Sequence, residues 1–273
     1  MSLEIQVVSE AKGSNHGGRC IVKEPGDRLP RPFYIKHCSS SRIHKGESSF
    51  MYIHQPIYEA VTCEMALRLG LETPNFYVLL NPKNDVTFIA TGEQKCDIRA
   101  KQPFYFASEL LIPPQNEDLT RAHELMIEDE FYRDMLMISD IVDRKNNYFY
   151  DEHSDSIIYL DLGCNFVDAH QNFIELKHHH KAPLEKKELK KAMKLFQKYS
   201  IITKSRRGNI GLIDFINLPR ELDLLTLNPR ERVRLDSLIS EEEIDEIIGR
   251  IASGLYYGKQ LKRNGDNPHL VRN

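Results

Sequence analysis

The stretch 134–167, DMLMISDIVDRKNNYFYDEHSDSIIYLDLGCNFV, most constrains how this chain can fold. Apolar residues at helical spacing run into a charged cluster at 143–147, and an apolar strand follows that ends on Asp161. Asp143 and Asp161 are therefore expected at the ends of buried elements, where a carboxylate is costly unless a cation or a proton compensates. Together with the amide of Asn147 they suit Mg²⁺, a hard cation that takes oxygen ligands and keeps phosphates in its shell. We interpret the stretch as the metal and phosphate end of a phosphotransferase.

Composition allows a sizeable core and argues against several classes of protein. The chain has 273 residues, 41% hydrophobic and 28% charged, which is typical of a soluble globular protein with one large domain or two small lobes. A net charge of −3 provides no global field to recruit nucleic acid or an anionic membrane. No apolar run reaches the roughly 18–20 residues that span a bilayer, so we expect no transmembrane segment.

Cysteine usage and the N-terminal sequence bear on the compartment. The five cysteines are scattered with no CxxC pair, which indicates reduced thiols in a cytosol-type environment. The opening residues, MSLEIQVVSEAKG, have neither the basic nor the apolar region of a secretory signal. We therefore expect a cytoplasmic protein, or one secreted into a host cell by a machine that reads other features.

A glycine-rich turn is predicted between strands at 3–8 and 19–24. The turn, residues 9–18, contains Gly13, Ser14, Asn15, His16, Gly17 and Gly18. Glycines let backbone N–H groups approach a phosphate closely, and consecutive N–H groups can form an anion nest. Because the turn matches neither a Walker A sequence nor GxGxxG, an ordinary hairpin loop is the alternative.

A lysine and a glutamate are placed to meet between a strand and a helix. Residues 33–36 are predicted to form a third strand, in which Lys36 lies on the opposite face from Phe33. Apolar residues at helical spacing predict a helix over 56–69, with Gly70 as its C-terminal stop. Glu59 lies on this helix, so we expect an ion pair between Lys36 and Glu59.

The fold class expected from these elements is α+β and bilobal. Residues 71–80 and 86–90 are predicted to form a hairpin, because the intervening Asn-Pro-Lys-Asn-Asp is rich in turn residues. An N-lobe over 1–95 would then hold a mostly antiparallel sheet with one helix. Residues 96–108 are assigned to a hinge, and 109–273 to a mostly helical C-lobe that the chain enters between 104 and 111.

Helical patterns dominate the proposed C-lobe. Residues 119–142 are predicted to form two helices or one broken helix, and a further helical stretch is expected within 210–239. Ser240 and Glu243 form a capping box before the last helix. The lysine-rich helix predicted at 183–200 is interpreted as a solvated face. The three consecutive histidines at 178–180 are interpreted as a loop, because neighbouring residues cannot all point to one ion.

The order of these parts resembles the protein-kinase superfamily. In detail the chain is most similar to the HipA family, which comprises bacterial toxin kinases and the secreted effector kinases of the CtkA type. The matching pieces are the loop 13–18, FYIK at 33–36, IYEA at 57–60 running on to LRLGL at 67–71, DRKNN at 143–147 and YLDLG at 159–163. The resemblance covers roughly residues 13–165, and beyond it only helical character agrees.

The resemblance implies a role for each candidate site residue. Lys36 would contact ATP phosphates together with the loop from Gly13 to Gly18, and Glu59 would orient Lys36. Asp143 would be the catalytic base, and Asn147 and Asp161 would hold Mg²⁺. This set suits phosphoryl transfer, which depends on positioning and charge neutralisation. The resemblance thus implies a serine/threonine protein kinase acting on a protein hydroxyl, its own included, as a bacterial toxin or translocated effector.

The loop after the catalytic aspartate departs from the family pattern. The metal asparagine usually stands five residues after that aspartate, where this chain has Tyr148, whereas Asn146 and Asn147 stand three and four residues after it. Lys145 replaces the usual histidine at the second position. A shortened loop could still bring Asn147 to the metal, or Asp140 could be the base in another register. A pseudokinase serving as a binding or regulatory module therefore stays open. So does a phosphoinositide-kinase-like lipid kinase, since lipid kinases also use an Asp-Arg-x-x-x-Asn loop.

Overall fold

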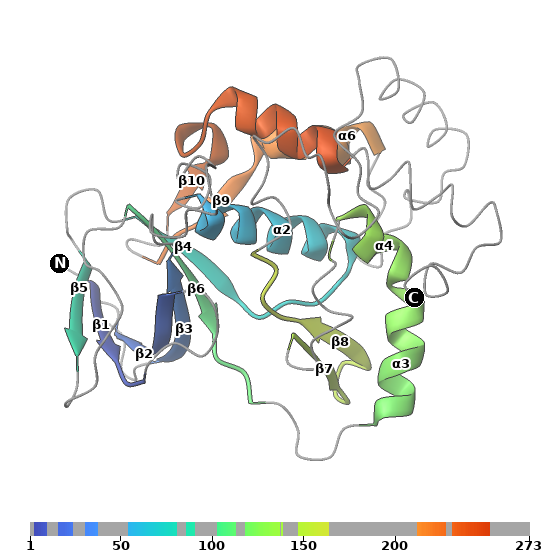
Figure 1. Ribbon diagram of the computed structural model, residues 1–273, viewed down its shortest axis with the longest axis horizontal. Coiled ribbons are helices and arrows are strands. Elements are labelled where there is room, and N and C mark those ends of the chain that lie inside the picture. Colours follow the sequence, from blue (N-terminus) through green and yellow to red (C-terminus); the bar gives the residue numbers. More distant parts are fainter. Residues whose placement is uncertain are drawn as a thin grey trace, which may run out of the picture.

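The structure is a computed structural model, and it describes residues 3–9, 16–23, 31–37, 54–80, 86–90, 103–112, 118–136, 138, 147–163, 212–227 and 231–251. These residues form a mixed α+β protein around a six-stranded sheet (Figure 1). The lysine-rich helix predicted at 183–200 and the histidines at 178–180 lie outside the described residues. No helix in the described part of the chain is long and apolar enough to cross a membrane.

The sheet contains strands β1 (Leu3–Val7), β2 (His16–Lys23), β3 (Arg31–His37), β4 (Phe76–Leu80), β5 (Val86–Ala90) and β6 (Phe104–Glu109). Their order across the sheet is β4-β6-β3-β2-β1-β5. Every neighbouring pair is antiparallel except β1 and β5, which run parallel. The expectation of a mostly antiparallel sheet is therefore confirmed.

The hairpin predicted from 71–80 and 86–90 is wrong. Both strands form, but β4 and β5 lie at opposite edges of the sheet, where β4 pairs with β6 and β5 pairs with β1. Turn residues predict that the chain leaves a strand, but they do not determine which strand it pairs with next. Strand β6 also lies within the range expected to hold the hinge and the entry to the second lobe, and it fills the position between β3 and β4.

Helix α2 (Gln55–Leu69) crosses one face of the sheet, as predicted (Figure 1). Pro56 stands in its first turn, where the missing N–H costs nothing. Gly70 ends the helix with a φ of 85°, a left-handed conformation that glycine adopts without steric cost. Most residues of α2 are buried, since the sheet covers one side of the helix and the C-terminal part of the chain covers another.

The two faces of the sheet bury different side chains. Phe33 and Ile35 pack with Tyr105 on the face away from α2, whereas Val78 and Phe106 pack beneath α2. In the register of β3 and β6, Lys36 pairs with Phe106, and the Lys36 ammonium lies 5.9 Å from the centre of that ring. Lys36 therefore lies on the opposite face from Phe33, as its strand period predicts.

A helix pair and a hairpin lie beside α2. Two helices form as predicted, α3 (Leu119–Glu128) and α4 (Glu130–Met135). The helical range expected over 119–142 is too long, because Leu136 and Ile138 lie beyond the end of α4, and residues 137 and 139–142 lie outside the described residues. The expected strand-turn-strand is also confirmed, as β7 (Tyr148–Asp151) paired with β8 (Ser156–Tyr159). Arg121 fastens α3 to the hairpin turn, because its Nε and Nη2 lie 2.9 and 2.7 Å from the two carboxylate oxygens of Asp155.

The helical stretch expected within 210–239 is only partly correct. Helix α6 (Leu212–Glu221) forms, but the chain continues as strands β9 (Asp223–Leu225) and β10 (Arg232–Arg234) and the short 3₁₀ helix η2 (Leu235–Ser237). Leu222 and Leu224 are buried on alternate positions, a period-two pattern too short to distinguish from a helix in the sequence. A bridge between Val78 and Thr226 brings this ribbon to β4.

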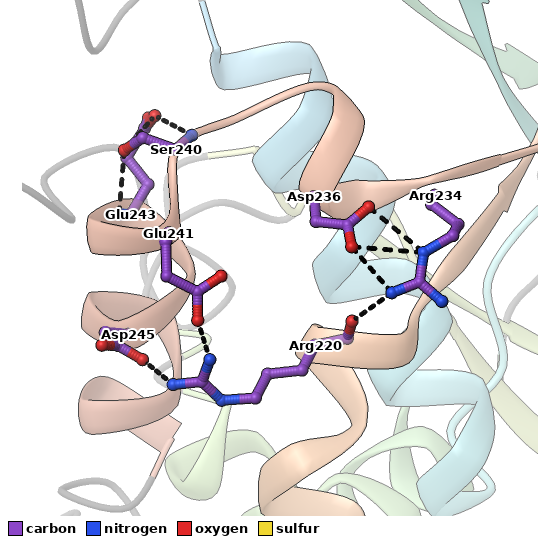
Figure 2. A network of polar contacts seen from close by, with 7 residues as sticks. All are labelled: Arg220, Arg234, Asp236, Ser240, Glu241, Glu243 and Asp245. Atoms are coloured by element: carbon purple, nitrogen blue, oxygen red, sulfur yellow. Dashed lines mark hydrogen bonds and ion pairs between the residues drawn. The ribbon is translucent and has the colours of Figure 1, made fainter.

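The last described helix covers residues 241–251, and its predicted capping box is confirmed. The backbone N–H of Ser240 donates to Glu243 Oε2 at 3.1 Å, and the N–H of Glu243 donates to Ser240 Oγ at 3.3 Å. Arg220, near the end of α6, forms ion pairs with Glu241 and Asp245 on the outer face of this helix (Figure 2). These contacts join α6 to the helix at 241–251, and both helices lie above α2 in Figure 1.

Candidate functional site

Three charged residues from distant parts of the chain meet at Lys36. Its Nζ lies 2.7 Å from Glu59 Oε1 and 2.7 Å from Asp161 Oδ1. The ion pair expected between Lys36 and Glu59 is therefore present, and Asp161 joins it. We call Lys36, Glu59 and Asp161 the charged triad.

Each member of the charged triad comes from a different element. Lys36 stands near the end of β3 on the face that α2 covers. Glu59 lies on α2 with its side chain only 3% exposed. Asp161 follows the last strand of the β7–β8 hairpin, and its side chain is 38% exposed. Asp161 is thus the member of the triad that a ligand arriving from solvent can reach most easily.

Backbone hydrogen bonds fix the chain on either side of Asp161. The N–H of Tyr159 donates to the carbonyl of Glu72 at 2.8 Å, and the N–H of Leu160 donates to the carbonyl of Asn147 at 2.7 Å. Asp161 itself has a φ of 55°, in the left-handed region that aspartate tolerates better than most residues. This turn of the backbone follows directly on the strand and delivers the carboxylate to Lys36.

Gly163 lies directly against the carboxylate of Glu59. A Cβ at position 163 would be 2.7 Å from Glu59 Oε2, closer than side-chain carbons come to other atoms. The glycine therefore lets the chain after Asp161 pass close to α2. The motif Asp161-Leu162-Gly163 thus contacts two members of the triad through its first and last residues.

In the charged triad the Lys36 ammonium forms ion pairs with two carboxylates. Burial alone would lower the pKa of Lys36, but Glu59 and Asp161 outweigh it and raise that pKa well above its ordinary value. Burial raises the pKa of Glu59 to about 7; the charge of Lys36 opposes this shift and that of Asp161 adds to it. With all three groups ionised the triad carries one excess negative charge, which favours a bound cation or proton.

The thiol of Cys63 lies one turn along α2 from Glu59. Burial first, and the charge of Glu59 second, raise the pKa of Cys63 well above its ordinary value. Cys63 is therefore a neutral buried thiol and not an activated cysteine.

Asp161 and Asn147 have the donor chemistry expected for Mg²⁺. Oδ1 of Asp161 contacts Lys36, and the residue before Asp161 is hydrogen bonded to the backbone of Asn147, which is buried. A carboxylate and an amide oxygen are ligands that Mg²⁺ accepts alongside water and phosphate. Among the residues that the structure describes, no three His, Cys, Asp or Glu side chains are grouped to hold a metal ion alone. The expected base, Asp143, and its alternative, Asp140, lie outside the described residues.

The glycine-rich segment differs from its prediction. Strand β2 begins at His16, so Gly17 and Gly18 are strand residues and not part of a turn. A Cβ at Gly17 would lie 2.0 Å from the carbonyl oxygen of Ile35, and one at Gly18 would lie 2.4 Å from that of Ser9. Close backbone approach therefore explains both glycines. Gly17 pairs with Lys36 in the register, which places this end of the segment beside the triad.

The remaining predicted nucleotide-binding residues, Gly13, Ser14 and Asn15, lie outside the described residues, as does the side chain of His16. The sequence interpretation missed the contact between Lys36 and Asp161 and the contact of Gly163 with Glu59. Each joins residues far apart in the chain, and neither periodicity nor spacing in a single sequence signals such a pair.

Comparison with known proteins gives the chain no family. No protein-family model matches it, and none of the curated proteins matches its sequence.

Proposed function

We propose that this chain is an ATP- and Mg²⁺-dependent serine/threonine protein kinase of the HipA and CtkA type. The observation that carries the proposal is the position of Lys36 Nζ, 2.7 Å from both Glu59 and Asp161. The resemblance implies that Lys36 contacts phosphate, that Glu59 orients Lys36 and that Asp161 binds the metal ion. Glu59 and Asp161 are 23 and 125 residues from Lys36 in the chain, and their meeting at its ammonium supports these three roles.

The proposed architecture is bilobal. The six-stranded sheet with α2 would form the N-lobe, and the segments after β6 would form the C-lobe. ATP would lie between them, over β2 and β3. The glycine-rich segment ends beside Lys36 in the register, which supports a phosphate position there.

In this proposal each residue has a defined task. Lys36 donates to phosphate oxygens of ATP, and Glu59 holds the ammonium in place. Asp161 and Asn147 would hold Mg²⁺, which neutralises charge on the phosphates when bound. The substrate hydroxyl oxygen attacks the γ-phosphorus, the bond to the ADP oxygen breaks, and Asp143 accepts the hydroxyl proton. The acceptor would be a serine or threonine of another protein or of the chain itself, and the setting would be a bacterial cytoplasm or a host cell.

A pseudokinase is the second candidate, and the spacing between Asp143 and Asn147 favours it. Asn147 is four residues after Asp143, one fewer than the family pattern requires. Such a chain would bind nucleotide at the charged triad without transferring phosphate.

The test incubates the full chain with Mg²⁺ and γ-labelled ATP, alone and with a generic protein substrate. Lys36→Met and Asp143→Ala should each lower the rate of transfer about 10²–10³-fold, the usual cost of removing one group that stabilises transition-state charge. Lys23→Met is the matched control, because Lys23 is an exposed lysine of β2 and should leave transfer unchanged.

Three results would overturn the proposal in distinct ways. Nucleotide binding without transfer would indicate the pseudokinase. Transfer to phosphoinositides alone would indicate a lipid kinase. Failure to bind nucleotide at all would remove the kinase interpretation of the charged triad.

A further inference from the structure

A second buried polar cluster lies on α2, outside the charged triad. Its centre is Glu243, which is 0% exposed. Glu243 lies on the helix at residues 241–251, which we call the C-terminal helix. One carboxylate oxygen, Oε1, lies 2.6 Å from His54 Nδ1 and accepts a hydrogen bond from the hydroxyl of Tyr58. These contacts join segments 189 and 185 residues apart. We call His54, Tyr58 and Glu243 the helix clasp.

The other oxygen of Glu243 belongs to the capping box of its own helix. Oε2 accepts from the backbone N–H of Ser240 at 3.1 Å and lies 3.4 Å from Ser240 Oγ. Figure 2 shows Ser240 and Glu243 joined by these contacts. One carboxylate oxygen of Glu243 therefore contacts α2 and the residue that precedes it, and the other contacts the start of its own helix. The cap fixes the carboxylate relative to the C-terminal helix, and the clasp fixes α2 relative to that carboxylate.

The carboxylate of Glu243 is strongly stabilised in its charged form. Burial would raise its pKa, but the hydrogen bonds from His54 and Tyr58 outweigh burial and lower that pKa to about 2. His54 is the N-cap residue of α2 but provides no side-chain cap, and the first turn of α2 has no acidic residue of its own. Glu243 thus supplies negative charge beside the start of α2, where the helix dipole favours it.

Tyr58 of the clasp and Glu59 of the charged triad are neighbours on α2. Consecutive residues of a helix point about 100° apart, so Tyr58 faces the C-terminal helix while Glu59 faces β3. A rotation or shift of α2 that broke the clasp would also carry Glu59 away from Lys36. Hydrogen bonds weaken steeply with misalignment, so a small movement of the helix is enough.

We propose that Glu243 is a positioning residue for the pair formed by Lys36 and Glu59. Through Tyr58 and His54 it sets the rotation of α2, and α2 then holds Glu59 on the ammonium. The effect on phosphoryl transfer rests on the proposed function, whereas the effect on the ion pair does not. The C-terminal helix thereby determines whether the ammonium of Lys36 is held against Glu59.

The first measurement needs no kinase activity. It follows acylation of Lys36 by acetic anhydride, read by mass spectrometry, because a paired ammonium reacts slowly. Asp161 also pairs with Lys36, so all variants carry Asp161→Asn, which leaves Glu59 as the carboxylate bonded to Lys36 among the described residues. Tyr58→Phe and Glu243→Gln should each raise the labelling rate about tenfold, the factor for losing one hydrogen bond to a charged group.

Glu242→Gln is the matched control, since Glu242 is exposed on the same turn of the same helix. It removes the same charge without touching the clasp, so Lys36 labelling should stay at the parent rate. Tyr58→Phe keeps the capping box intact and serves where Glu243→Gln fails to fold. Labelling of Lys36 that stays unchanged in a folded Tyr58→Phe variant, while its melting temperature falls, would overturn the proposal and leave the clasp a purely structural contact.

The second measurement uses phosphoryl transfer without the Asp161 change. Tyr58→Phe should lower kcat/KM for ATP about tenfold in the parent chain and have no further effect in a Glu59→Gln background, because the clasp acts through Glu59. Equal losses in both backgrounds would overturn the coupling. Labelling that responds as expected in a chain that transfers no phosphate would reject the proposed function and support the positioning role.

Discussion

The Nζ of Lys36 lies 2.7 Å from Oδ1 of Asp161, and 125 residues separate the two in the chain. Because Glu59 binds the same ammonium, the position of Lys36 depends on the sheet, on α2 and on the β7–β8 hairpin together.

Glu59→Gln is expected to remove a pH dependence of stability. The folded pKa of Glu59, about 7, lies above its ordinary value of 4.5. Its contribution to stability is therefore complete below about pH 4.5 and is lost as the pH rises through about 7. The free energy of unfolding of Glu59→Gln, taken relative to that of the parent chain, should therefore increase as the pH rises from about 5 to about 8. Guanidinium unfolding at both pH values measures the difference.

Glu64→Gln is the control for this pH dependence. Glu64 is also on α2 but is paired with Arg68 at the surface, so its loss should cost at most about 0.5 kcal/mol at either pH. A difference between Glu59→Gln and the parent that is the same at both pH values would contradict the raised pKa of Glu59.

Asp161→Asn is expected to abolish stabilisation by Mg²⁺ and ATP. A ligand at about one hundred times its Kd adds roughly 2.7 kcal/mol to the free energy of unfolding. The Asp161 side chain is the most exposed of the charged triad and the proposed metal ligand, so loss of its charge should remove the rise in melting temperature. Asp151→Asn, at the other end of the hairpin, should keep the rise, and EDTA should reverse it in the parent chain. An unchanged rise in Asp161→Asn would place the metal elsewhere.

Gly163→Ala should destabilise the chain by about 1–3 kcal/mol through overpacking. The new Cβ would lie 2.7 Å from Glu59 Oε2, so either the chain after Asp161 or the glutamate must move. In a Glu59→Ala background the clash is absent and most of the cost should disappear, which a double-mutant cycle in denaturant measures. A cost that persists there would assign the strain to other neighbours, of which Gln55 Nε2 lies 3.4 Å from the same position.

Ser240→Ala should cost about 1 kcal/mol of unfolding free energy by removing the cap of the helix at 241–251. The Ser240 hydroxyl accepts from the N–H of Glu243 at 3.3 Å, and alanine leaves that N–H without this acceptor. Ser240→Thr keeps the hydroxyl and should lose much less. Thermal unfolding that falls equally in both variants would show that packing at position 240 matters more than the cap.

Features encoded within a few residues could be predicted from the sequence. Helix α2 with its stop at Gly70, the β7–β8 hairpin and the capping box of Ser240 and Glu243 all depend on contacts within about one turn. The same holds for the face of β3 on which Lys36 lies, because the strand period of two determines it. The pair of Lys36 and Glu59 was expected from the likeness of this strand and helix to the lysine-bearing strand and glutamate-bearing helix of protein kinases.

Strand neighbours and distant contacts could not be predicted in this way. An alternating pattern shows which side chains are buried but not which strand lies beside them, so β4 and β5 were expected to pair and lie instead at opposite edges. Asp161 was assigned to a metal, whereas its contact with Lys36 depends on the packing of the hairpin beside α2. The clasp of Glu243 with Tyr58 likewise depends on tertiary packing, although the capping box itself was visible.

The position of β6 determines which fragments of this chain can be produced alone. A fragment ending at residue 95 contains β3 and β4 but lacks the strand that pairs with both. Its sheet would end at an unpaired edge of β3, and β4 would lose the strand that joins it to the sheet. Such unpaired strands promote edge-to-edge aggregation. Fragments that extend through Glu109 contain β6 and so restore its pairing with both β3 and β4. The shortest soluble piece carrying Lys36 and Glu59 should therefore include the whole of β6.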